Sequence, residues 1–282
     1  MKKIHPFYWS ALIMVLSQIV SLLVASKVRG YLEQHQIVLP EVSLGVPLAY
    51  FIGAVGLLGL VLFIIPVSKL KIVFRFLFVL LFTWGLFVDL GFFLPEIPSA
   101  LISFCLALVW LFRPRIWLHD ILFILTLAAF GAIFGSLLEP WTIVIFMLIL
   151  SVYDILAVRF GYMMWMAKKL SKLETLPAFI FPKDIRGWNM DIREIALLDE
   201  EASERNFSLL GGGDVGFPLI LIAAILLAYG TGSSIVMCGF ALAGLAAVYW
   251  IQRVFLKGKP IAALPPITIS CLAGFLIVYF VW

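Results

Sequence analysis

The sequence has few charged side chains for its length. Only 13% of its 282 residues are Asp, Glu, Lys or Arg, against about a quarter in an ordinary globular domain. Hydrophobic residues make up 64% of the chain, and its mean hydropathy is +1.14. A water-soluble surface cannot be built from so few charges, which excludes a soluble enzyme. It also excludes a nucleic-acid-binding protein inferred from the basic pI of about 9.0.

Residues typical of metal and disulfide sites are equally scarce. The cysteines lie within apolar runs at spacings that fit neither a metal site nor a disulfide framework, so we predict that they are small core residues. No His-Glu-x-x-His motif occurs, and we expect the histidines to face water or lipid headgroups. The sequence therefore predicts no metal and no cofactor. These residues are Cys105, Cys238, Cys271, His5, His35 and His119.

Long apolar runs account for most of the chain. A membrane-spanning helix needs about 20 mainly apolar residues, and the sequence offers nine such runs. We therefore predict an all-α polytopic membrane protein with nine transmembrane helices. The first run follows Lys2 and Lys3, and we interpret it as a retained span rather than a cleaved signal peptide. The predicted spans are residues 7–26, 43–66, 72–90, 96–112, 117–138, 141–162, 209–229, 233–256 and 261–281.

The positions of Lys and Arg indicate an orientation, because these residues collect on cytoplasmic connections. With a cytoplasmic N-terminus, 18 of the 20 fall on cytoplasmic segments, and only Lys27 and Arg29 fall outside. We predict an integral protein of the cell membrane whose N-terminus lies in the cytoplasm and whose C-terminus lies outside. The positive net charge then follows from topology and does not indicate an acidic partner.

One connection differs from the others, because residues 163–208 carry 15 of the charged side chains. It divides the chain into a six-span bundle (1–162), a cytoplasmic connecting loop (163–208) and a three-span unit (209–282). Within the loop we expect an amphipathic extension of the sixth helix over Met163–Leu176. We also expect a short acidic helix over Asp191–Glu204.

Two acidic residues lie inside predicted spans, where an ionisable group is costly and marks a candidate functional site. Asp154 comes five residues before Arg159 in the sixth span, and Asp214 comes five residues after Leu209 in the seventh. Helical rise puts both about 7–8 Å from the cytoplasmic boundary, so they can face each other if their helices are neighbours. We expect the other acidic residues at span ends to be reached by water or headgroups: Asp89, Glu96, Asp120 and Glu139.

Two carboxyl groups that share a site cannot both ionise easily, because like charge and poor solvation oppose the second ionisation. One group then keeps a proton while the other is a carboxylate. This is the arrangement of aspartic proteases, in which the carboxylate takes a proton from water and the protonated partner donates to the peptide carbonyl. Asp154 and Asp214 are therefore predicted to be the catalytic pair.

Glycines and prolines flank the predicted site. Gly211, Gly212 and Gly213 precede Asp214 and allow a close approach of backbone. Pro265 lies six residues after Lys259, so about 9 Å inward from the same face. Proline inside a helix removes a hydrogen bond and bends it. We expect a bend here that leaves unpaired carbonyl groups at the depth of the aspartates.

These places resemble the presenilin/signal-peptide-peptidase family of intramembrane aspartyl proteases. Tyr153-Asp154 matches the Tyr-Asp motif of the family's sixth span, and Gly211-x-Gly213-Asp214 matches the Gly-x-Gly-Asp motif of its seventh. Ala263-Leu264-Pro265 matches most of the Pro-Ala-Leu-Pro motif that opens its ninth span. The sequence departs from this last motif at Ala262, which stands in place of the first proline.

The resemblance implies an intramembrane aspartyl endopeptidase of the Gly-x-Gly-Asp type that cleaves transmembrane helices of membrane proteins in the lipid bilayer. It implies catalysis by Asp154 and Asp214 in a site shaped by Tyr153, by the glycines and by Ala263–Pro265. It also implies that the segment Arg205–Leu210 pairs with an extended substrate through added-strand hydrogen bonds. The predicted orientation favours a presenilin-like member over a signal-peptide-peptidase-like one, since the latter are inverted in the membrane.

A proton- or ion-coupled transporter or channel is the alternative that the residues leave open. Paired intramembrane acids and broken helices also serve transport. Against it, no internal repeat pairs the two halves of the chain, and the aspartates are confined to the inner third of the predicted membrane layer.

Overall fold

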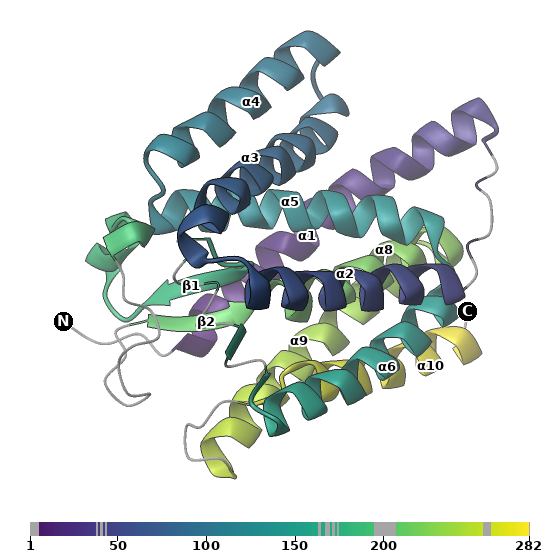
Figure 1. The fold of residues 1–282 in the computed structure, drawn as a ribbon. Coiled ribbons are helices and arrows are strands. Elements are labelled where there is room, and N and C mark those ends of the chain that lie inside the picture. Colours follow the sequence, from purple (N-terminus) through teal and green to yellow (C-terminus); the bar gives the residue numbers. More distant parts are fainter. Residues whose placement is uncertain are drawn as a thin grey trace.

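The computed structural model describes residues 6–37, 39, 42, 44–162, 165–166, 170, 173, 175–194, 207–255 and 261–281. In these residues the chain forms nine α-helices and one two-stranded antiparallel sheet (Figure 1). The helices are α1 (Pro6–His35), α2 (Gly45–Ile64), α3 (Val67–Gly91), α4 (Glu96–Phe112), α5 (Ile116–Leu137), α6 (Pro140–Arg159), α8 (Gly212–Tyr229), α9 (Thr231–Val254) and α10 (Leu264–Val281). The strands are β1 (Ala178–Pro182) and β2 (Phe207–Gly211), and short 3-10 turns cover Ile185–Asn189 and Ile192–Glu194.

The helices correspond one for one to the nine predicted spans. Among the described residues, eight helices are long and apolar enough to cross a membrane, and α4 is a shorter apolar helix of 17 residues. The largest difference in length is at the first span, which was predicted over residues 7–26, whereas α1 continues to His35. The seventh span was predicted to begin at Leu209. Residues 207–211 form β2 instead, and α8 begins only at Gly212.

Helices α5 and α8 form the centre of the bundle. On one side α5 packs against α3, which packs against α4, and on the other side α8 packs against α9 and α6 (Figure 1). Gly131 and Gly135 allow α8 to approach α5 closely. A Cβ on Gly135 would lie only 2.6 Å from the Cβ of Ala223 and 2.7 Å from the carbonyl oxygen of Ile220. Small residues at such contacts let membrane helices pack backbone to backbone, and this seam positions the helix that carries Asp214.

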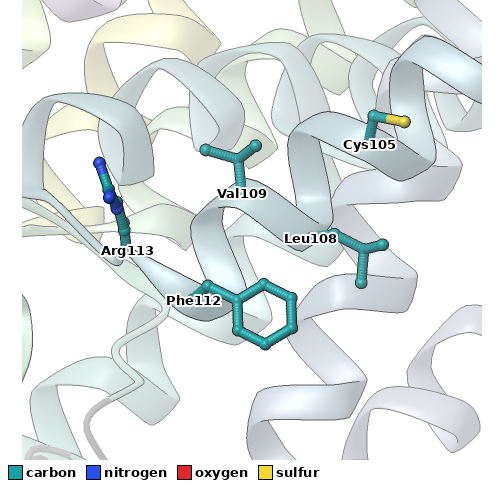
Figure 2. A pocket seen from close by; sticks show the side chains of 5 residues that line it. All are labelled: Cys105, Leu108, Val109, Phe112 and Arg113. Atoms are coloured by element: carbon teal, nitrogen blue, oxygen red, sulfur yellow. The ribbon is translucent and has the colours of Figure 1, made fainter.

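Several helices present apolar side chains outward, as a membrane protein does to lipid. In α2 only Leu62 is buried. On α4, Cys105 is exposed and lines a shallow groove with Leu108, Val109, Phe112 and Arg113 (Figure 2). The prediction that all three cysteines are core residues is therefore wrong for Cys105, because an apolar run does not tell the lipid face of a helix from its packed face.

The connection between α6 and α8 contains a two-stranded sheet, of which β1 was not expected from the sequence, whereas β2 overlaps the segment Arg205–Leu210 for which strand pairing was implied. Strands β1 and β2 pair in antiparallel register from Ala178 opposite Gly211 to Pro182 opposite Phe207. The predicted helix over Met163–Leu176 lies largely outside the described residues. Of the predicted acidic helix over Asp191–Glu204, only residues 191–194 are described, and Ile192–Glu194 form a 3-10 turn.

Candidate active site

Three helix ends meet where the sequence predicted the site. Asp154 lies near the C-terminal end of α6, Asp214 lies in the first turn of α8, and Leu264 is the first residue of α10. Helix α10 packs against both α6 and α8, and α6 packs against α8. The residues predicted from three separate stretches of sequence are thus brought together by direct helix contacts.

Asp154 is bound to the beginning of α10. Its Oδ2 accepts a hydrogen bond of 3.2 Å from the backbone N–H of Leu264. The first N–H groups of a helix have no partner within the helix, and Pro265 and Pro266 have no N–H at all. Leu264 therefore offers the only backbone donor among the first three residues of α10, and Asp154 receives it.

The two prolines act differently from the prediction. We expected them to bend the ninth span from inside, but α10 begins at Leu264, so Pro265 and Pro266 stand in its first turn. Proline is tolerated there because no intrahelical donor is required. The preceding residues Ile261–Ala263 are not helical. The site is therefore shaped by a helix start, whose partial positive charge favours a nearby carboxylate.

Asp214 stands at a second helix start. It is the third residue of α8 and accepts a hydrogen bond from the backbone of Gly211. The carboxyl groups of Asp214 and Asp154 are near enough to act on each other electrostatically. Both side chains are half-buried. The arrangement places two interacting carboxyl groups beside the N-termini of α8 and α10.

The three glycines before Asp214 differ in how much space they have. A Cβ on Gly212 would lie 2.5 Å from Cζ of Phe123 and 3.1 Å from the carbonyl oxygen of Pro177. At Gly213, which is exposed, the nearest atom would be Cε2 of Phe217 at 3.2 Å. Among the three glycines, Gly212 is therefore the one whose position, between Phe123 of α5 and the residue before β1, leaves no room for a side chain.

The remaining predicted residues line the same region. Tyr153 packs edge to face against Phe51 of α2, with ring centroids 6.1 Å apart. Leu264 is buried with Phe146 and Leu150 of α6, while Ala263 and Pro265 are half-buried. The structure thus gathers the predicted residues around the two aspartates.

Two hydroxyl pairs near the site were missed by sequence reasoning. Ser151 of α6 donates a hydrogen bond of 2.8 Å to Oγ1 of Thr268 of α10, close to one helical turn from Asp154 and Leu264. The hydroxyl groups of Ser10 of α1 and Tyr249 of α9 are hydrogen bonded to each other. Tyr249 also lies near enough to Asp214 to interact with it electrostatically. Hydroxyls within spans were the available signal, but sequence alone does not say which ones face each other.

Three residues that were expected to face water or headgroups are buried instead. Asp120 is 1% exposed, His119 is fully buried and Asp89 is 5% exposed. The expectation rested on their nearness to span ends, where charged groups commonly reach the membrane surface. It fails because neighbouring helices and β1 cover these ends.

Comparison with known proteins identifies the family. A family model for signal-peptide peptidase, presenilin aspartyl protease matches residues 11–282. Two solved structures of a presenilin family intramembrane aspartate protease, in different crystal forms, align with TM-scores of 0.68 and 0.66 at 20% identity. They cover 99% and 100% of this chain and 100% of each of those chains. No curated protein sequence matches.

At 20% identity the solved structures establish similarity of fold, and this confirms the predicted all-α polytopic membrane architecture. The family model covers nearly the whole chain, including both aspartates and the start of α10. The chain is an integral membrane protein, and it belongs to the signal-peptide-peptidase/presenilin family of aspartyl proteases.

Proposed function

We propose that the protein is an intramembrane aspartyl endopeptidase of the Gly-x-Gly-Asp type, with Asp154 and Asp214 as its catalytic pair. The observation that carries this proposal is the meeting of the two carboxyl groups, from α6 and α8, beside the first residue of α10. In a chain of this family, two interacting acids held at helix N-termini fit the requirements of peptide hydrolysis.

The chemistry needs one ionised and one protonated carboxyl group. The ionised aspartate takes a proton from a water molecule, whose oxygen attacks the peptide carbonyl, while the protonated aspartate donates to the carbonyl oxygen. The tetrahedral intermediate then collapses as the C–N bond breaks. The aspartate that took the proton from water gives it to the leaving nitrogen, and the other aspartate regains its proton from a hydroxyl group of the intermediate. Leu264 and Gly211 contribute backbone hydrogen bonds that orient the two carboxyl groups.

A cleavage assay on the purified protein tests this function. The wild-type protein in liposomes should convert a labelled transmembrane-helix peptide into two products, and a peptide mimic of the tetrahedral intermediate should block the conversion, because such mimics bind more tightly than substrate. Ion flux through the same liposomes, with no peptide products, would instead support the transporter.

We propose that the substrate binds as an extended strand at the edge of β2 that faces away from β1. The N–H of Gly212 donates to the carbonyl of Pro177 over 2.9 Å, which marks these two as facing residues. The backbone N–H and C=O groups of successive residues point to opposite edges of an antiparallel strand. Those of Leu210 and Ser208 therefore point toward β1, while those of Leu209 and Gly211 point away from it. The outward groups of Gly211 lie beside Asp214, so a strand paired there would reach the aspartates.

Replacing Leu209 with proline tests the strand. Proline removes the outward N–H without taking a hydrogen bond from β1, so kcat/KM should fall on the order of tenfold, the effect of leaving a substrate carbonyl unpaired. Leu209→Ala keeps the N–H and controls for the side chain. Equal activity of the two variants, measured with the same peptide, would rule out pairing at this edge.

For the orientation, we propose a cytoplasmic N-terminus and an external C-terminus in the cell membrane, supported by the distribution of Lys and Arg. The turn between α8 and α9 at Gly230 then faces outside. In a variant that lacks the three native cysteines, a single cysteine introduced at Gly232 should react with an impermeant thiol reagent added to intact cells. Protection until lysis would indicate the inverted orientation.

A further inference from the structure

The beginning of α5 holds two buried polar residues that the proposed reaction does not use. Nε2 of His119 lies 3.2 Å from the carbonyl oxygen of Ala178, and Oδ1 of Asp120 accepts a hydrogen bond of 3.2 Å from the backbone N–H of Ile180. Both partners belong to β1. Two adjacent side chains of one helix therefore bind an acceptor and a donor on the same strand.

These contacts fall on the outer edge of β1. In the register, Ala178 lies opposite Gly211 and Ile180 lies opposite Leu209. Since the backbone groups of Gly211 and Leu209 point away from β1, those of Ala178 and Ile180 point away from β2. A third strand added beside β1 would need the Ala178 carbonyl and the Ile180 N–H. The side chains of α5 already occupy both groups.

The packing around these side chains fixes their orientation. The His119 ring stacks on Phe78 and Phe123 with centroids 6.1 Å and 5.6 Å away. Phe123, one helical turn after His119, also packs on Phe179 of β1 at 4.9 Å and fills the space beside Gly212. One face of α5 thus contacts β1 and the residues that lead into Asp214.

Burying the Asp120 carboxyl group is energetically unfavourable. It is almost completely buried, and its Oδ2 has no hydrogen-bond partner among the residues that the structure describes. A buried polar atom left without a partner costs free energy that an apolar side chain of similar size would not. The contact with Ile180 is the specific interaction gained in return.

We propose that His119 and Asp120 are positioning residues that close the outer edge of β1, so that an extended substrate can pair only with β2. The inference rests on the proposed protease function. Helix α5 then occupies the edge of β1 at which a further strand would otherwise pair. The side chains hold the register of β1, and through the sheet they hold the position of Gly211 relative to Asp214.

Asp120→Leu tests the proposal, since leucine is similar in size but cannot accept the Ile180 N–H. Hydrogen exchange of the Ile180 amide should become faster in Asp120→Leu and stay slow in Asp120→Asn, which keeps the acceptor oxygen. In the cleavage assay, Asp120→Leu should raise KM more than it lowers kcat. Its products, read by mass spectrometry, should spread over additional cleavage positions, whereas Asp120→Asn should retain the wild-type set.

Two further variants separate positioning from stability. His119→Phe keeps a stacked ring but loses the contact with Ala178, and it should widen the product set in the same way. Thr126→Val removes a buried hydroxyl of α5 that donates to the carbonyl oxygen of Leu122 in the same helix, and it should leave the product set unchanged.

Unchanged Ile180 exchange in Asp120→Leu, or a wild-type product set in both Asp120→Leu and His119→Phe, would overturn the proposal. If the wild-type protein cleaves no peptide, the protease function fails. The exchange of Ile180 then still decides whether Asp120 holds the strand.

Discussion

Asp214→Asn and Asp154→Asn should each abolish detectable cleavage while leaving the protein folded. Asparagine keeps the size of aspartate, and its carbonyl oxygen can still accept the backbone hydrogen bonds from Gly211 and Leu264. It cannot exchange a proton with water or with the peptide. Since proton transfer by one positioned group contributes about 10²–10⁴-fold to a rate, each variant should lose at least that factor.

The matched control for this experiment is Asp89→Asn. Asp89 is also a buried carboxyl group within a spanning helix, but it lies on α3, outside the three helix ends that form the site. Its replacement should leave cleavage intact. Product peptides are quantified by mass spectrometry, and folding is monitored by thermal unfolding. If either Asp154→Asn or Asp214→Asn cleaved the peptide at the wild-type rate, that result would refute the assignment of the catalytic pair.

Leu264→Pro should reduce cleavage strongly, because it removes the backbone donor to Asp154. The substitution deletes the N–H that binds Asp154, yet proline is well accepted at the first position of a helix. A hydrogen bond to a charged group contributes about 1.5–3 kcal/mol, so kcat should fall roughly ten- to hundredfold.

The buried side chain of Leu264 is lost in the same variant, and Leu264→Ala provides the control. Alanine removes the packing against Phe146 and Leu150 but keeps the N–H. The alanine variant should unfold at a lower temperature than the wild-type protein. At the temperature of the assay it should be more active than the proline variant. The opposite order of activities would show that Leu264 acts through its side chain.

The sequence predicts the catalytic pair because a carboxyl group inside an apolar run is a strong physical signal. Asp154 and Asp214 could be placed at one depth by counting residues, and their helices are neighbours in the structure. The start of the ninth span could be located in the same way, although the prolines begin α10 rather than bend it. What counting cannot give is the partner of each group, such as the Leu264 N–H.

Strand β1 and its pairing with β2 were not predictable, for a reason that lies in their residues. All five residues of β1 are buried, so the strand reads as a short apolar run without alternation. Such a run cannot be told from a buried helical segment by period alone. The apolar pair Leu209-Leu210 likewise reads as the start of a span. Only pairing between segments far apart in the sequence makes them strands.

The burial of His119 and Asp120 was missed for a related reason. A polar group at the end of a span ordinarily reaches water, and nothing local indicates otherwise. In the structure, aromatic residues of α3, α4 and α5 surround the His119 ring, and β1 takes the hydrogen bond of Asp120. These residues are contributed by distant parts of the chain.

The central claim is that the Asp154 and Asp214 side chains lie next to each other, and a crosslinking measurement tests it most directly. Asp154→Cys and Asp214→Cys are combined in a variant that lacks the three native cysteines, with a protease site inserted in the connecting loop. After treatment with a short bifunctional thiol reagent and cleavage of the loop, the two fragments should migrate as one species. A pair using exposed Val152→Cys in place of Asp154→Cys should separate. Fragments that separate for the aspartate pair with every short reagent would contradict the account.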